Sequence, residues 1–223
     1  MKIFSKYFAL VLALAGMHAT PAQAIFLTSD TLAGATVIDF STQATVSNVS
    51  GPIQIGTSAG LDIQVNGDPN SGLYTNFNGF GLGSNGSWGS GMTYIVADHA
   101  RPGSLIFQFL SGPVSGVGAF MNYAPNVGGD LIIRAFDSGL SLLEEYNVTA
   151  LADISTLNAI NGGAFRGIER ATTDISFFEV SGFVPVVDDL TFSSGNAQVP
   201  EPGALALIGL GLLGLAWSRR KFI

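Results

Sequence analysis

Two adjacent acidic residues stand inside a predicted strand near the end of the chain's long middle region. Asp188 and Asp189 interrupt a mostly apolar segment, 184–192. Neighbouring side chains of a strand point to opposite faces, so one of these carboxylates should face the core. A buried carboxylate needs a hydrogen-bonded partner or a cation. Carboxylate and carbonyl oxygens are the ligands of Ca²⁺, so we expect a structural calcium here. The alternative is that both aspartates are turn or edge residues.

This ending also resembles the terminal strand of jelly-roll carbohydrate-binding modules. In those modules, an aspartate near the C-terminus and an acidic residue near the first strand hold a structural calcium. The resemblance implies that Asp39, in the sequence Val37-Ile38-Asp39-Phe40, is the first-strand partner of Asp188 and Asp189.

Aromatic residues are scattered through a segment rich in Gly, Asn and Ser, 66–91, and just beyond it. Sugars present apolar C–H faces to aromatic rings, while amides and carboxylates bind their hydroxyls. We therefore take Trp88, Tyr74 and Tyr94 as candidate glycan-binding residues, with Trp88 in Gly86–Gly91 as the strongest. The alternative is that these rings cap the protein core.

Motifs of catalysis and of metal binding by histidine are weak. Gly56–Gly60 fits the G-x-S-x-G pattern of a serine hydrolase, which needs a strand, a turn and then a helix, together with a histidine. A second strand is expected after it, at 61–65, and His99 is the only histidine downstream of the N-terminal segment. We expect a Gly-rich turn at 56–60, no enzymatic activity and no catalytic residues.

Composition excludes other classes of protein. The chain has no cysteine, so it has neither disulfides nor Cys-ligated metal sites. The region 25–198 holds four arginines, no lysine and all but one of the 16 acidic residues. Nucleic-acid binding needs a basic surface, so we expect no nucleic-acid partner. An acidic surface favours solubility outside the cell or affinity for divalent cations.

The middle region reads as β-structure. Apolar residues alternate with polar ones in many short segments separated by Gly-rich turns, and only 150–157 could form a helix. Leu105, Phe107 and Phe109 should share one face. Asp137-Ser138-Gly139 predicts a hairpin between strands 131–136 and 140–148. We expect an all-β fold, an antiparallel β-sandwich that is jelly-roll-like.

The N-terminus has the features of an export signal. Lys2 and Lys6 precede an apolar segment, 7–16, and Ala22-Gln23-Ala24 is a small-x-small cleavage site. The sequence predicts a signal peptide at 1–24 with cleavage after Ala24, followed by an ectodomain at 25–198.

The C-terminus, 199–223, has three parts. Val199-Pro200-Glu201-Pro202 cannot continue a helix and should stay extended. An uncharged apolar segment, 204–217, could form a short transmembrane helix. The basic residues Arg219, Arg220 and Lys221 should then remain on the cytoplasmic side. An ordinary C-terminal anchor would share the last two of these parts.

The order of these parts resembles the PEP-CTERM sorting signal of Gram-negative bacteria. The resemblance rests on Val199–Pro202, the apolar segment, the double arginine and the terminal position. It implies recognition and cleavage by the membrane protease-transpeptidase exosortase, transient anchoring in the inner membrane, and a final place at the cell surface or outside the cell. Such proteins are often associated with exopolysaccharide and biofilm matrix.

The sequence therefore indicates two candidate functions. The first is a non-enzymatic surface or matrix protein delivered by its sorting tail. The second is a carbohydrate-binding adhesion module with a structural calcium.

Overall fold

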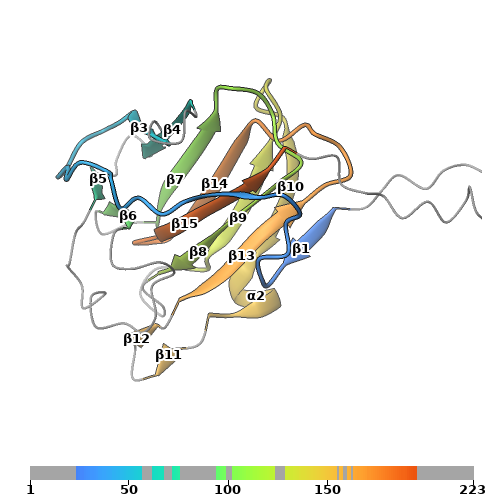
Figure 1. Ribbon diagram of the computed structural model, residues 1–223. Coiled ribbons are helices and arrows are strands. Elements are labelled where there is room, and N and C mark those ends of the chain that lie inside the picture. Colours follow the sequence, from blue (N-terminus) through green and yellow to red (C-terminus); the bar gives the residue numbers. More distant parts are fainter. Residues whose placement is uncertain are drawn as a thin grey trace, which may run out of the picture. The chain divides into compact units, whose positions relative to one another are not determined.

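The computed structural model describes residues 24–56, 62–67, 72–75, 94–98, 102–123, 129–154, 156–157, 160–161 and 163–194 (Figure 1). Residues Ala24–Ala197 form one compact unit. All the strands described below belong to it.

The first sheet has seven strands in the order β1-β13-β8-β15-β6-β5, with β2 also paired to β15 (Figure 1). Every pairing in it is antiparallel. The strands are β1 (Ile25–Leu27), β2 (Thr36–Ile38), β5 (Gly72–Thr75), β6 (Ile95–Asp98), β8 (Gly116–Asn122), β13 (Ala164–Glu169) and β15 (Val186–Ser193).

The second sheet has six strands in the order β10-β9-β14-β7-β4-β3, and it too is antiparallel throughout. Its strands are β3 (Ile53–Ile55), β4 (Ile63–Gly67), β7 (Pro102–Phe109), β9 (Ile132–Phe136), β10 (Leu142–Asn147) and β14 (Phe177–Phe183). Two further strands, β11 (Thr156–Leu157) and β12 (Ile160–Asn161), pair only with each other, and the described helix α2 spans Val148–Ala152.

The main core lies between these two sheets. Leu105, Phe107 and Phe109 of β7 are buried in it, as their alternation predicts, together with Val117 and Leu190 of the other sheet. The rings of Phe109 and Phe192 also bridge the sheets, with centroids 5.2 Å apart. The expected all-β, antiparallel two-sheet fold is confirmed.

The predicted hairpin at Asp137-Ser138-Gly139 joins β9 and β10. Asp137 Oδ1 accepts hydrogen bonds from the main-chain N–H groups of Gly139 and Ser141, both at 2.8 Å. The predicted strand 140–148 is longer than the observed one. Leu140 belongs to the turn, with a φ of 61°. Leu142 is exposed, and the register of β10 against β9 shifts between Leu142 and Glu144.

Candidate functional site

Strand β15 changes its neighbour on one side along its length. Its first part pairs with β6, at Val186–Val96 and Val187–Ile95. Its last part pairs with β2, from Leu190–Ile38 onward. Asp188 and Asp189 fall between these two pairings. We call this stretch of β15 the strand junction.

On its other side, β15 is irregular at the same place. Asp188 pairs with Phe120 of β8, and the next pair in register is Thr191 with Gly118. One extra residue therefore lies on β15, which defines a β-bulge. Asp189 has a φ of 48°, and its carbonyl accepts a hydrogen bond from Thr191 Oγ1 at 2.9 Å. Because the bulge breaks simple alternation, both carboxylates are held on this short irregular stretch.

The carboxylate oxygens of the two aspartates have few hydrogen-bond partners among the described residues. Asp188 is 0% exposed and Asp189 is half-buried. Asp188 Oδ1 accepts a hydrogen bond from the N–H of Asp189 at 2.8 Å. Asp188 Oδ2 and Asp189 Oδ1 are buried and have no hydrogen-bond partner within the described structure. Burial raises the pKa of Asp188 to about 8, and the neighbouring charges of Asp189 and Asp39 add to this rise.

Asp39 lies at the margin of the junction. It follows Ile38, the last residue of β2 to pair with β15. Its side chain is exposed and accepts hydrogen bonds from Ser41, from Oγ at 2.8 Å and from the main-chain N–H at 3.1 Å. The Ser41 hydroxyl lowers the pKa of Asp39. The structure thus brings Asp188 and Asp189 together and places Asp39 near enough to act on Asp188 through its charge.

Among the described residues, no three His, Cys, Asp or Glu side chains are grouped closely enough to hold a metal ion. A calcium at the junction would therefore have two carboxylate ligands, from Asp188 and Asp189, and would take its other oxygens from main-chain carbonyls or water. The predicted calcium stays a prediction, and Asp39 fits a supporting role better than a ligand role.

The candidate glycan-binding tyrosines are buried. Tyr94 is 1% exposed and Tyr74 is 8% exposed. They pack with Val96, Val184 and Val186 in a second apolar cluster. Burial also raises the pKa of Tyr94. A buried ring has no free face for a sugar, so these two residues serve the core in the structure described here. Trp88 lies outside the described residues.

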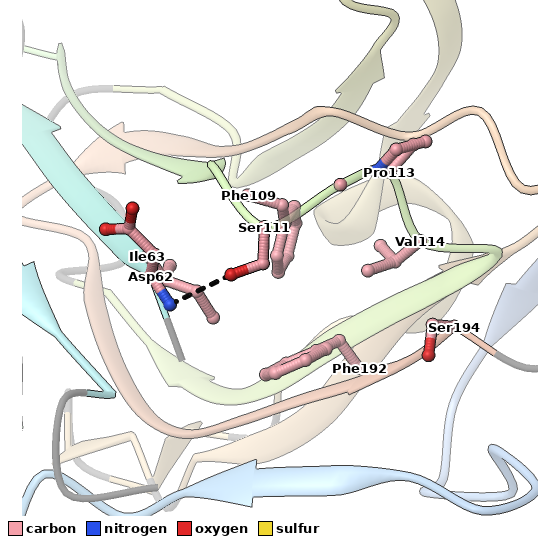
Figure 2. Close-up of a pocket in the computed structure, with 9 residues that line it drawn as sticks. Asp62, Ile63, Phe109, Ser111, Pro113, Val114, Phe192 and Ser194 are labelled. Carbon is pink, nitrogen blue, oxygen red and sulfur yellow. Dashed lines mark hydrogen bonds between the residues drawn. The ribbon is translucent and has the colours of Figure 1, made fainter. Parts of the chain in front are cut away.

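A small pocket opens at one end of the sandwich (Figure 2). It has a volume of about 140 Å³, below the size typical of sites for drug-sized ligands. Asp62 donates its main-chain N–H to Ser111 Oγ at 3.2 Å, beside the rings of Phe109 and Phe192 (Figure 2). The Asp62 carboxylate accepts a bond from Gln54 Nε2 at 2.7 Å. Asp62 is the one ionisable side chain among the residues that line this pocket, whereas glycoside hydrolysis uses a pair of carboxylic acid side chains.

Several predicted residues lie outside the described ranges. They are Ala22 of the signal-cleavage site, Val199, Pro200, Glu201 and Pro202 of the sorting motif, and Arg219, Arg220 and Lys221 of the basic cluster. Ala24 is described and directly precedes β1. Of the helices in the described part of the chain, none is long and apolar enough to cross a membrane.

Sequence reasoning missed the ion pairs made by two arginines. Arg170 Nε and Nη2 bond the carboxylate of Asp174 at 2.8 and 3.0 Å, and Nη1 bonds Glu144. Arg134 joins Glu145 and Glu179 across three neighbouring strands, at 2.6 and 3.1 Å. The composition could have predicted such pairs, because four arginines among 15 acidic residues in 25–198 each have several carboxylates available as partners.

Comparison with known proteins gives a local match and a distant structural likeness. No curated protein matches the chain. The Lys-gingipain K2 cleaved adhesin domain is a solved structure with 12% sequence identity and a TM-score of 0.43; the match covers 73% of this chain and 99% of that one. Residues 198–221 match the PEP-CTERM protein-sorting motif. The C-terminal segment of this chain is therefore a PEP-CTERM sorting motif, as its residues led us to expect.

Proposed function

We propose that this protein is a non-enzymatic cell-surface or extracellular-matrix protein, delivered and processed by exosortase through its C-terminal tail. The match of residues 198–221 to the sorting motif is the observation that carries the proposal. That motif implies export and recognition by exosortase. The reaction chemistry then belongs to exosortase, and this chain is its substrate.

The tail would act in two steps. The apolar segment 204–217 would hold the exported chain in the inner membrane, with Arg219 and Arg220 on the cytoplasmic side. Exosortase would then read the extended Val199–Pro202 segment and cut near it. The sandwich would remain at the surface or leave the cell, where we place it with exopolysaccharide in a biofilm matrix.

The ectodomain has features suited to such a destination. Its strands form two antiparallel sheets around one extensive core, without cysteines to be oxidised outside the cell. Successive strands pass from one sheet to the other, as β6, β7, β8 and β9 do, which supports the jelly-roll-like description. Its acidic character favours solubility and affinity for cations.

A carbohydrate-binding role is the alternative, and it has less support. Two of its three candidate residues, Tyr74 and Tyr94, are buried. The role would then depend on Trp88. A Trp88→Ala protein that binds host exopolysaccharide as tightly as the unchanged protein would remove this alternative.

The proposal is tested by finding the termini of the processed protein. The full chain is produced in a bacterium with its own exosortase and in a strain without that enzyme, and both forms are analysed by mass spectrometry. We expect the N-terminus at Ile25 in both strains. We expect the C-terminal residues up to Ile223 only in the strain without exosortase.

Variants separate the sorting motif from general effects on export. Glu201→Ala should block removal of the tail, whereas Pro113→Ala, a proline change outside the tail, should leave processing unchanged. Recovery of the intact polypeptide from Met1 to Ile223 in the cytosol would contradict the proposal.

A further inference from the structure

The strand junction has buried acceptor atoms that the described structure leaves unsatisfied. Among the described residues, none donates a hydrogen bond to Asp188 Oδ2 or Asp189 Oδ1, although Asp188 is 0% exposed. The junction falls between the part of β15 that pairs with β6 and the part that pairs with β2, so no described strand pairs with Asp188 or Asp189 on that side. Buried acceptors of this kind need a donor or a cation.

The arginines of the described structure are engaged elsewhere. Arg134 pairs with Glu145 and Glu179, and Arg170 pairs with Glu144 and Asp174. Arg166 donates to main-chain carbonyls. These three side chains therefore do not neutralise the junction.

A proton shared between Asp188 Oδ2 and Asp189 Oδ1 is the competing partner for these oxygens, and it would leave only one of the two carboxylates ionised. A pair held by a shared proton would bind no Ca²⁺ in the dialysis described below. One cation could bind both oxygens together and offset the repulsion between adjacent carboxylates.

We propose that the strand junction is a Ca²⁺ site in which Asp188 and Asp189 are the carboxylate ligands. Ca²⁺ accepts six to eight oxygens in flexible geometry, so main-chain carbonyls and water can complete the shell. Mg²⁺ demands a near-ideal octahedron and loses its water reluctantly, which suits an irregular bulge less well. The exposed carboxylate of Asp39, held by Ser41, adds negative charge that attracts the cation.

The first test uses the full chain, purified in detergent and freed of metal with EDTA. Equilibrium dialysis should show one Ca²⁺ bound per chain. Saturating Ca²⁺ should raise the melting temperature by about 5–10 °C, as expected when a ligand near 100 times its Kd binds only the folded protein. Mg²⁺ at the same concentration should raise it less.

Variants then locate the binding site. Asp188→Asn and Asp189→Asn should each abolish the Ca²⁺-induced shift, and Asp39→Asn should weaken binding without abolishing it. Asp30→Asn, which changes an exposed acid elsewhere, is the matched control and should keep the full response.

Three outcomes would overturn the proposal. They are no Ca²⁺ bound by the unchanged protein, a shift that survives both Asp188→Asn and Asp189→Asn, and an equal shift with Mg²⁺. The dialysis result does not depend on any variant folding. It is also independent of processing by exosortase, so the sorting proposal can stand or fail separately.

Discussion

The guanidinium of Arg166 supports main-chain atoms. Its Nε and Nη2 both donate to the carbonyl of Ala152, at 2.9 and 2.7 Å, and Nη1 donates to the carbonyl of Phe165 at 2.7 Å. Burial lowers its pKa, and the nearby charge of Asp153 opposes that change. Since Ala152 ends α2, this side chain caps carbonyls that the short helix cannot satisfy itself.

We predict that Arg166→Met lowers the free energy of unfolding by about 1–3 kcal/mol, because partly buried carbonyls lose charged donors. Arg166→Lys should retain only part of the stability lost in Arg166→Met, since lysine lacks the planar guanidinium with its several N–H donors. Urea denaturation measures the free energy of unfolding of both variants. Arg134→Lys, at a partly exposed ion pair, should cost less. An Arg166→Met protein as stable as the unchanged protein would refute this role.

Leu140 is a second residue with a clear local consequence. It is 64% exposed and adopts a φ of 61° in the β9–β10 turn. A left-handed backbone costs an ordinary side chain about 1–2 kcal/mol, and asparagine tolerates it better. We predict that Leu140→Asn raises the melting temperature by about 2–4 °C.

The control for this turn is Leu142→Asn. Leu142 is also exposed but lies at the start of β10, where asparagine is disfavoured. Leu142→Asn should therefore lower the melting temperature. Equal effects of Leu140→Asn and Leu142→Asn would show that surface polarity, and not backbone strain, determines the change in melting temperature.

At the level of single strands, β8 and β13 approach each other at a pair of glycines. Gly118 lies opposite Gly167 in the ladder. A Cβ atom at Gly118 would come within 2.8 Å of the carbonyl oxygen of Arg166 and 2.5 Å of Phe165 Cζ. The main chains of β8 and β13 cannot move apart at this point without breaking the pairing between the two strands.

We predict that Gly118→Ala lowers the free energy of unfolding by about 1–3 kcal/mol through overpacking. Gly139→Ala is the control, because its nearest contact is a carboxylate oxygen at 3.3 Å in an open turn. Denaturant titration of the full chain compares the two. A Gly118→Ala protein as stable as the Gly139→Ala protein would mean that the sheet relaxes more readily than we argue.

The sequence predicted many of the segments that form strands, but it did not predict where a strand contains a bulge. The alternation at Leu105, Phe107 and Phe109 depends on local periodicity, which the sequence displays directly. The bulge at Asp189 depends on how β15 meets β8, a contact between residues about 70 positions apart. The acidic pair drew attention to the junction, but its unsatisfied oxygens became visible only in three dimensions.

At the scale of the whole molecule, the order of strands within each sheet was beyond sequence reasoning. β1 lies beside β13, and β2 lies beside β15, so the beginning of the compact unit Ala24–Ala197 pairs with strands near its end. Such long-range pairing depends on which apolar faces fit together across the core. The sorting motif was predictable because its meaning is carried by residues that follow one another in the chain.

The position of β1 would limit the time available for removal of the predicted signal peptide. Ile25, the first residue after the predicted cut, pairs in register with Glu169 of β13. If the chain is cut after Ala24, the Ala24–Ile25 bond is accessible only until β1 pairs with β13. Cleavage would therefore have to precede this pairing, which cannot form before β13, some 140 residues later, has been synthesised.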